Sequence, residues 1–353
     1  MKKHIEKYCR EVISIAISVC SDSFPPFLGL TLLSFLPAFL YGCSAPEALP
    51  DRTMSACTRI SLVSAERQME DIDIFVFNDD RMQHLDCYQR VEDLPSWNNE
   101  LVSGSGDKII TVCANAGEKM NEWYKISSLS HFREITMSLE EDSMIYPLMS
   151  GITYSSSGGK NGRTDVRLSP LMSIVELRSI RCDFAERPYA GEKMTDVKVY
   201  LTNMNADCRI MDHENILPLR VINAGRLRED EMKLLNDPAM AMQEIRGEIG
   251  KETIHPGIKL ACYPNNSTAE GPGTPFTRIV IEAKVQGETF YWPLDINRQE
   301  NGYGIGRNER YIFDLAITRK GMKDPDTPIC AEDMDITFTI EKWNEKQDYP
   351  ITF

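Results

Sequence analysis

Hydrophobic and polar residues alternate with a period of two along most of the chain after residue 57. In the clearest run, 71–77, Ile72, Ile74 and Val76 fall on one face, and the Asn-Asp-Asp sequence that follows is typical of a turn. Such alternation predicts β-strands with one face toward a core, because successive side chains of a strand point to opposite sides. The same pattern occurs at 58–63, 108–114, 166–168, 174–182, 197–201, 279–285, 311–317 and 336–340.

Many short strands with one apolar face predict an all-β fold of antiparallel β-sandwiches with a few short helices. Helical signals are sparse. Residues 227–248 are rich in Met, Leu, Glu and Lys and form the best helix candidate, although Pro238 interrupts them. A shorter helix is expected around 116–129.

The N-terminal segment has a different pattern. A basic start precedes an apolar run at 27–40, which is too short for a permanent membrane helix and suits a secretory signal. The next residues resemble the bacterial lipobox, in which a small residue precedes a cysteine that is acylated and becomes the new N-terminus. Leu40 and Gly42 match that pattern before Cys43, whereas Tyr41 is bulkier than usual. We predict a lipoprotein signal peptide at 1–42 and lipid on Cys43; an ordinary secretion signal or a buried N-terminal helix is the alternative.

Two segments divide the rest of the chain. Residues 43–56 contain two prolines and several small residues, which predicts a flexible tether. The stretch 154–164 (YSSSGGKNGRT) is the most linker-like internal segment, so domains are predicted at 57–163 and 164–353. It could equally be a long loop inside one domain, and the boundary would then move toward 187–188.

Charge and cysteine spacing exclude several classes of protein. The chain has 53 Asp and Glu against 39 Lys and Arg, and removing residues 1–42 changes the formal net charge from −14 to −15. Such a chain repels nucleic acid and anionic lipid, so neither is expected as a partner. The seven cysteines after Cys43 are widely spaced without a CxxC pair, which argues against zinc and thioredoxin-like sites. Most, such as Cys113, are expected in the core, and one disulfide stays possible.

Catalytic motifs are absent from the sequence. The histidines are scattered without HExxH, and neither a GxSxG elbow nor Walker spacing occurs. The glycines at 302–306 and the acidic residues at 323–326 are typical of turns, and the latter lack a calcium-ligand series. Trp292 and Trp343 are expected to pack in the core or at an interface, and the alternative is that they form a platform that binds a sugar. We expect no enzyme, no metal or organic cofactor, and no small-molecule substrate.

The lipobox, the tether, two all-β domains and an acidic composition together resemble the type V fimbrial anchor family of Bacteroidales, the FimB-like anchor lipoproteins of major and minor fimbriae. The resemblance is carried by 71–80, 291–294, the Arg-Asn-x-x-Tyr pattern within 307–315, Gly321 and 336–343. It implies a transthyretin-like sandwich in each domain. It also implies a lipid-anchored, surface-exposed place on the outer membrane at the base of a fimbrium, with fimbrial subunits as partners.

The resemblance further implies a mechanism of assembly. Shaft subunits of this class lose an N-terminal strand by cleavage after a basic residue, and a strand from the next subunit fills the groove. Arg52 and Arg59 are the basic residues near the candidate first strand, 58–63. In an anchor we expect this strand to stay, because it lies between Cys43 and the first domain. The alternatives are a processed shaft or tip subunit, a surface glycan-binding lipoprotein, and a hydrolase built on a β-sandwich.

Overall fold

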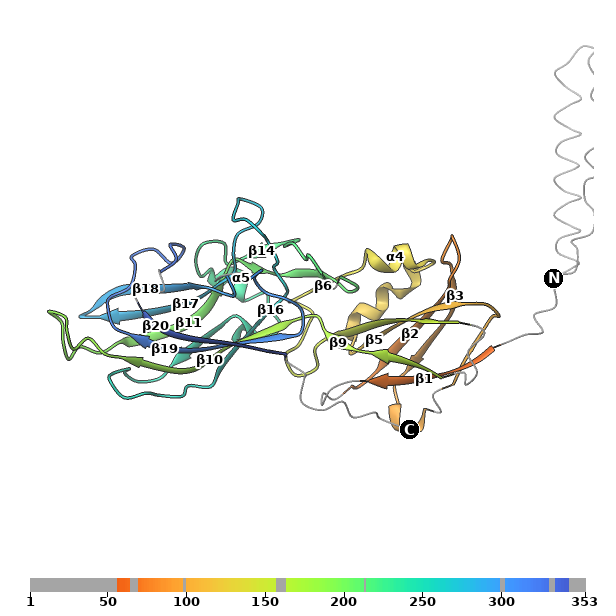
Figure 1. Cartoon of the computed structure of the whole chain (residues 1–353), viewed down its shortest axis with the longest axis horizontal. Helices are drawn as coiled ribbons and strands as arrows, with labels where there is room; N and C mark the ends of the chain where they lie inside the picture. Colours follow the sequence, from red (N-terminus) through yellow and green to blue (C-terminus); the bar gives the residue numbers. More distant parts are fainter. Residues whose placement is uncertain are drawn as a thin grey trace, which may run out of the picture. The chain divides into compact units, whose positions relative to one another are not determined.

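β-Strands account for most of the regular secondary structure of the described residues, as the period-two pattern predicts (Figure 1). The computed structural model describes residues 56–63, 69–97, 100–156, 163–212, 214–298, 302–329 and 334–342. The strands of the first part are β1 (Ala56–Val63), β2 (Ile72–Asn78), β3 (Leu85–Val91), β4 (Glu100–Ser103), β5 (Lys108–Ala114), β6 (Thr136–Ser138), β7 (Met149–Ser155), β8 (Arg163–Arg167) and β9 (Ser169–Pro170). Those of the second part are β10 (Ser173–Cys182), β11 (Thr195–Thr202), β12 (Met204–Asn205), β13 (Asp207–Arg209), β14 (Val221–Ile222), β15 (Met242–Ile245), β16 (Ile258–Cys262), β17 (Arg278–Val285), β18 (Glu288–Asp295), β19 (Glu309–Ile317) and β20 (Met334–Lys342).

The first sandwich combines a five-stranded sheet, β3-β2-β5-β7-β9, with a three-stranded sheet, β4-β1-β8. Its core includes Ile72, Ile74 and Val76 of β2, which lie on one face of the strand as the alternation predicts. They pack in one cluster with Leu101 of β4 and Val166 of β8. The apolar face of the larger sheet is therefore directed at the smaller one.

The opposite face of the five-stranded sheet is also buried, which the alternation at 71–77 does not indicate. Phe75 and Phe77 of β2 lie under a short helical layer, and the ring of Phe75 is 5.3 Å from that of Trp123 and 4.8 Å from that of Phe132. Phenylalanines on what looks like the outer face of a strand are explained by this second layer, because each large ring that leaves water stabilises the fold by about 2–3 kcal/mol.

The second sandwich combines the sheets β16-β10-β19-β20 and β15-β11-β17-β18. Ile279 and Ile281 of β17 face Tyr311 and Phe313 of β19 across its core, as the period-two patterns of these segments predict. Tyr311 is fully buried, in agreement with its predicted place in the core. The same core cluster continues into the helical layer over the first sandwich, and all described residues belong to one compact unit.

Helices are few and short. They are α4 (Leu129–Arg133), α5 (Glu229–Met232) and the 3-10 helices η1 (Leu94–Ser96), η2 (Gly117–Lys125) and η3 (Pro238–Met240). The expected helix around 116–129 corresponds to η2 and the start of α4. The predicted helix at 227–248 is wrong: it contains only α5 and η3, and then Met242–Ile245 forms strand β15 against β11. Pro238 ends any helical continuation, and the edge of β11 offers the chain backbone partners instead.

The predicted fold class, all-β with two transthyretin-like antiparallel β-sandwiches and a few short helices, is confirmed. Two pairings differ from an antiparallel arrangement, since β1 runs parallel to β8 and β10 runs parallel to β19. Alternation shows which residues share a face but carries no information on strand direction. The described part of the chain contains no helix long and apolar enough to cross a bilayer.

The domain division at 57–163 and 164–353 stays a prediction. Strands β8 and β9, which follow the segment 154–164, still pair with β1 and β7 of the first sandwich. The strand pairings change only between Pro170 and Ser173, where β10 begins the second sandwich. The pairings thus favour the alternative of a loop inside the first sandwich, with the change of sheets well before 187–188.

The cysteines whose side chains are described carry no disulfide. Cys87, Cys113, Cys182, Cys208 and Cys262 are free, and all but Cys87 are buried. Burial raises the pKa of Cys262 and of Cys208 to about 12, so these thiols are protonated at neutral pH and behave as small core residues. This confirms the prediction for Cys113, which is fully buried.

Candidate functional site

Strand β1 is the middle strand of its sheet, although it is the first described segment of the chain. It pairs antiparallel with β4, where Cys57 lies opposite Val102, and parallel with β8, where Leu62 lies opposite Val166. The order β4-β1-β8 means that the two outer strands are joined through β1. Removal of β1 would leave two strand edges without backbone partners.

The place that β1 occupies has an apolar floor. Leu101 of β4 and Val166 of β8 are buried, and they share a core with Ile74, Ile110 and Val112 of the facing sheet. Backbone groups on both sides and buried apolar side chains beneath are what an added strand requires: the ladders supply affinity and the alternate side chains supply specificity. This slot is the candidate functional site.

Only one of the predicted site residues lies in the described part of the chain. Arg59 is in the middle of β1, with its backbone opposite Glu100 of β4 and Arg163 of β8. Leu40, Gly42, Cys43 and Arg52 lie outside the described residues, as does nearly all of the tether 43–56.

A strand paired on both sides is a poor protease substrate, because a protease needs the extended backbone free of its ladder. Cleavage after Arg59 would therefore require β1 to leave the sheet first.

Two edge strands of the second sandwich, β18 and β15, have hydrogen bonds beyond their own sheet. A segment after β19 bonds to β18, with Met322 N donating to Tyr291 O at 2.7 Å and Ile329 N donating to Pro293 O at 3.0 Å. On the other side, the side chain of Gln243 in β15 donates to the carbonyl of Lys259 in β16 at 2.8 Å. Such contacts reduce unwanted pairing at these two strands, whereas β1 is paired along both of its sides and is the candidate for exchange.

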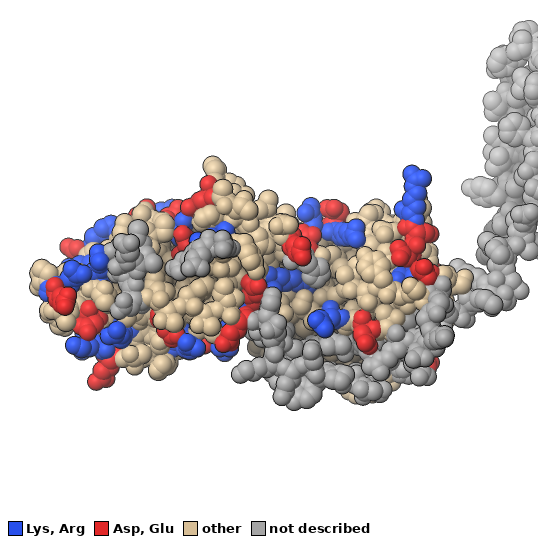
Figure 2. Space-filling view, in the orientation of Figure 1, with Lys and Arg blue, Asp and Glu red and all other residues tan. Residues whose placement is uncertain are grey.

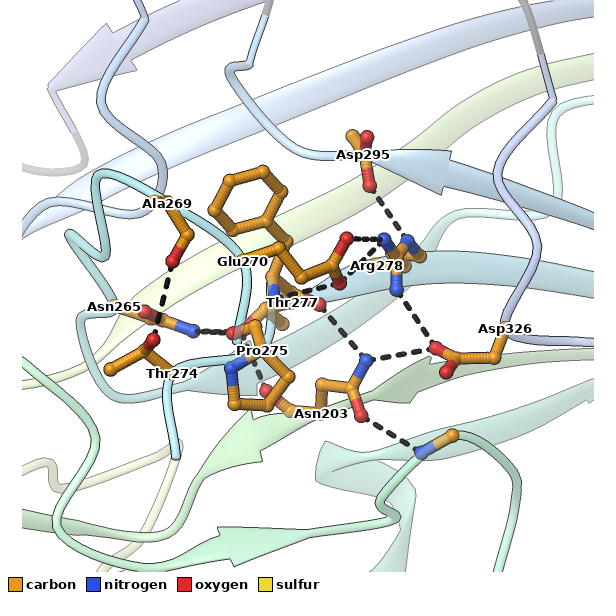
Figure 3. Close-up of polar contacts among 12 residues, drawn as sticks. Asn203, Asn265, Ala269, Glu270, Thr274, Pro275, Thr277, Arg278, Asp295 and Asp326 are labelled. Carbon is orange, nitrogen blue, oxygen red and sulfur yellow. Dashed lines mark hydrogen bonds and ion pairs between the residues drawn. The ribbon is translucent and has the colours of Figure 1, made fainter. Parts of the chain in front are cut away.

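A buried arginine organises the loops over the outer face of β17 (Figure 3). The guanidinium of Arg278, 2% exposed, donates to three carboxylates from three segments of the chain. Its Nε lies 2.7 Å from Asp295 Oδ1, its Nη1 lies 2.8 Å from Asp326 Oδ1, and its Nη2 lies 2.7 Å from Glu270 Oε1. Asn203 extends the cluster, since its Nδ2 donates to Asp326 Oδ1 at 3.1 Å.

This cluster has the geometry of a structural clamp. Burial raises the pKa of Asp295 above its ordinary value, a property that catalytic acids share. However, the Asp295 carboxylate is bound to Arg278, and the other two carboxylates share the same guanidinium. Because all three carboxylates are paired with Arg278, the cluster is better suited to joining loops than to general acid catalysis, which needs an acid within hydrogen-bond reach of a substrate.

Other kinds of site find little support among the described residues. No group of three or more His, Cys, Asp or Glu side chains there is arranged to hold a metal ion. Trp292 is fully buried and donates to the carbonyl of Arg319, so it is no sugar platform, and Trp343 lies outside the described residues. A groove of about 520 Å³ over the β11 and β17 strands is lined mainly by charged residues, without an aromatic ring among them.

Sequence reasoning missed two buried arginines, Arg278 and Arg307. Arg278 directly precedes the apolar run Ile279–Ile281 of β17, and Arg307 follows a glycine-rich turn; each is a local signal that a charge is held against the core. The partners of Arg307 could not be found from the sequence, because its acceptors lie 95 to 157 residues away. In the sequence, the motif that contains Arg307 indicates a family resemblance and gives no sign of what the buried side chain binds.

No model of a protein family matches the chain, and no curated protein matches its sequence. Solved structures share its fold. A candidate cell adhesion protein from Bacteroides eggerthii has 16% sequence identity and a TM-score of 0.62, with 82% of this chain and 96% of that chain covered.

Two further solved structures are similar. A candidate cell adhesion protein from Parabacteroides distasonis has 15% identity and a TM-score of 0.58, covering 85% of this chain and 98% of its own. A fimbrilin from Porphyromonas gingivalis has 14% identity and a TM-score of 0.54, with coverages of 81% and 98%. At these identities the likeness establishes a common fold.

Proposed function

We propose that the mature chain is a lipid-anchored subunit of a surface fimbria and that it anchors the fimbria to the outer membrane. The observation that carries this proposal is the place of β1, a strand from the beginning of the folded region that is inserted between β4 and β8. The fold shared with a fimbrilin supports it. The lipobox-like sequence before Cys43 supplies the link to the membrane.

The membrane link rests on the fatty acids carried by Cys43. Each buried CH₂ group contributes about 0.8 kcal/mol, so several acyl chains hold a protein on a membrane firmly. The tether then spaces the first sandwich from the lipid. Because β1 comes next along the chain, a cut after Arg52 or Arg59 would separate the folded region from its lipid. An anchor must therefore keep β1, and other surfaces bind the last subunit of the shaft.

The proposed role involves no catalysis. The carboxylates around Arg278 are bound to it, and the described cysteines are buried or have a raised thiol pKa. Protein–protein contacts made by strands and their edges are sufficient for the role. The partners are fimbrial subunits and the outer membrane.

The second candidate is a processed shaft or tip subunit. The same position of β1 favours it, because a strand that fills a slot can be replaced by a strand from a neighbour. Its mature N-terminus would be Thr53 or Ile60, after Arg52 or Arg59. This candidate differs from the anchor in one measurable property, the N-terminus of the protein found in assembled fimbriae.

The lipid link is tested by Cys43→Ala in the native host. We expect fatty-acid labelling to be lost and the protein to leave the membrane fraction. Cys20→Ala, a change to another cysteine of the N-terminal segment, is the matched control and should keep both. Labelling that persists in Cys43→Ala would remove the lipid anchor from the proposal.

The choice between anchor and shaft is tested by mass spectrometry of the protein from purified fimbriae. A lipidated peptide that begins at Cys43 and continues past Arg59 supports the anchor. A dominant N-terminus at Thr53 or Ile60 contradicts it and supports the processed subunit.

A further inference from the structure

Arg307 places a charged side chain in the interior of the protein. The residue is 8% exposed, and its guanidinium makes six hydrogen bonds. The acceptors are Pro170 O (2.9 Å from Nε), Ile210 O (3.2 Å from Nη1), Asp212 O (3.0 Å from Nη1), Ser150 O (3.4 Å from Nη2), Ser150 Oγ (2.9 Å from Nη2) and Ser169 O (2.8 Å from Nη2). Five of the six acceptors are backbone carbonyls.

These acceptors come from both sandwiches. Ser150 is in β7, and Ser169 and Pro170 form β9, so all three belong to the five-stranded sheet of the first sandwich. Ile210 and Asp212 follow β13, and Arg307 itself precedes β19 of the second sandwich. Ser150 Oγ also donates to Ile210 O at 2.6 Å, so that carbonyl receives hydrogen bonds from two directions. One guanidinium thus joins three separate segments.

The turn that carries Arg307 is held in place by its own contacts. Asn308 has a φ of 58°, the left-handed conformation that allows the chain to turn before β19. The hydroxyl of Ser173 donates to Gly306 O at 2.6 Å and accepts from Glu309 N at 2.9 Å, which fixes both sides of Arg307. The side chain is therefore directed from a rigid base.

A guanidinium without a bound carboxylate is sensitive to the placement of its acceptors. Arginine has five N–H donors in a planar fork, and when the group is buried all five need acceptors in the same conformation. Burial lowers the pKa of Arg307 to about 10, which leaves the group charged at neutral pH. If the two sandwiches moved apart, a buried charge would lose its acceptors, and removing one side of such an arrangement is strongly destabilising.

Other hydrogen bonds also connect the two sandwiches near Arg307, in the region called the junction below. Strands β6 and β13 pair across it, and Leu139 N donates to Ala206 O at 2.9 Å. Tyr263, at the end of β16, donates its hydroxyl to Asp142 at 2.9 Å. The junction is therefore bonded on several sides of Arg307.

We propose that Arg307 is a positioning residue that joins the two sandwiches into one cooperative folding unit without a hinge. The proposal does not depend on the fimbrial role. Arg307 is the first residue of the Arg-Asn-x-x-Tyr motif, and the proposal assigns to it the role of joining the two sandwiches.

Hydrogen exchange and calorimetry of the full-length protein test this proposal. In the wild type, we expect the slowest amides of β5 and of β17 to open with the same equilibrium constant, because both report the same global unfolding. In Arg307→Met, the two constants should separate by about tenfold or more, and the single calorimetric transition should split into two.

The matched control is Arg278→Met. Arg278 is also a buried arginine, but its carboxylate partners lie within 270–326 of the second sandwich. This variant should lower the melting temperature while β5 and β17 keep comparable opening constants.

Arg307→Lys covers the case in which Arg307→Met does not fold. Lysine has three donors instead of five, so we expect a lower melting temperature and a smaller separation of the two constants in the same direction. If β5 and β17 open together in every folded Arg307 variant, Arg307 does not join the sandwiches and the proposal is wrong. Equal separation in Arg278→Met would also overturn it.

Discussion

Asp142 is a buried carboxyl group that takes part in the contacts between the sandwiches. Its Oδ1 accepts from Leu148 N at 2.9 Å and from Ser143 N at 2.8 Å, and its Oδ2 accepts from the hydroxyl of Tyr263. Burial nevertheless raises the pKa of Asp142 to about 6, against an ordinary value of 3.8. The folded protein thus holds this proton at pH values where the unfolded chain has released it.

Replacing Asp142 with Asn should remove part of the pH dependence of stability. Between about pH 4 and 6 the folded state binds more protons than the unfolded state, so the free energy of unfolding falls as pH rises through this window. Each tenfold change in proton affinity is worth about 1.4 kcal/mol, which makes the full effect about 3 kcal/mol at most. Asparagine keeps Oδ1 as an acceptor and stays neutral.

The measurement is urea unfolding of wild type and Asp142→Asn at pH 4, 5, 6 and 7. We expect the variant to gain stability relative to wild type as the pH rises. A difference that is constant across the series would show that Asp142 does not titrate in this range.

Individual residues were predictable where the reason for their burial is local. Tyr311 and Cys113 stand in apolar strand patterns, and both are fully buried. Arg307 owes its burial to strands and loops far along the chain, and Arg278 owes it to partners 8 to 48 residues away, so the sequence shows each charge near apolar residues without its partners. The same holds for Asp142, whose partner Tyr263 is 121 residues away.

At the scale of elements, the strands were predictable from the sequence, whereas the long helix predicted at 227–248 does not form. Alternation marks a strand because one face must be dry, and the segments at 174–182 and 311–317 satisfy it. The segment 227–248 has good helix formers, but propensity is worth less than 1 kcal/mol per residue. The ladder between β15 and β11 and the burial of Met232 and Met240 outweigh it.

Gly321 is predicted to be essential for covering the edge of β18. A Cβ at this position would lie 2.1 Å from Tyr291 O and 2.9 Å from a ring carbon of Trp292. Gly321→Ala should therefore push the covering segment away and lower the free energy of unfolding by about 1–3 kcal/mol. Hydrogen exchange at Tyr291 and Met322 should accelerate.

The matched control is Gly273→Ala, because a Cβ there meets no atom within 4 Å. Its free energy of unfolding should stay within about 0.5 kcal/mol of wild type. Equal effects of the two substitutions would mean that steric contact at Gly321 is not the cause.

Strand β1 can be fixed in its slot by one substitution. Val102 is 66% exposed and lies directly opposite Cys57 in the antiparallel pair of β1 and β4. Opposite residues of such a pair have Cα atoms about 4.5–5.5 Å apart, within the range that a disulfide spans, so we expect Val102→Cys to form a disulfide with Cys57 under oxidising conditions. The disulfide would prevent β1 from leaving.

If the protein is an anchor, cells with oxidised Val102→Cys should carry as many attached fimbriae as the wild type, with or without reductant. Electron microscopy and shear release of fimbriae measure this, and Val102→Ser is the control that cannot form the bond. Loss of attachment that is restored by dithiothreitol would contradict the anchor and show that β1 must leave.

At the scale of the whole molecule, the charge is spread and mixed. Although the chain has a formal net charge of −14, Lys and Arg alternate with Asp and Glu over the face in view, and no large area of either sign stands out (Figure 2). On this face, a polyanion finds no extended basic area to bind.

Metal removal should leave the protein unchanged. The described residues include no cluster suited to a metal ion. The clustered carboxylates of Glu270, Asp295 and Asp326 are paired with Arg278. We expect the melting temperature after dialysis against EDTA to stay within about 1 °C of the untreated value, since a ligand that binds only the folded state would raise it. A larger fall, reversed by calcium or zinc, would contradict this.

The two sandwiches could be predicted from the number of alternating segments, but their connection could not. The sequence places a linker at 154–164 because of its glycines and serines, whereas the sheets change after Pro170. One hydrophobic core contains both Phe75 of the first sandwich and Phe313 of the second. The sequence does not show this, because it does not tell which faces of the two sandwiches are in contact.

The mixed pairing of β1 gives the slot a direction. One wall, β4, runs opposite to β1, and the other wall, β8, runs with it. Because parallel and antiparallel ladders space their hydrogen bonds differently, a guest strand entering backwards would mismatch both walls. Subunits joined through such a slot must all point the same way, head to tail. A fibre of that kind has two unlike ends, and a copy that keeps its own strand in the slot can meet only one of them.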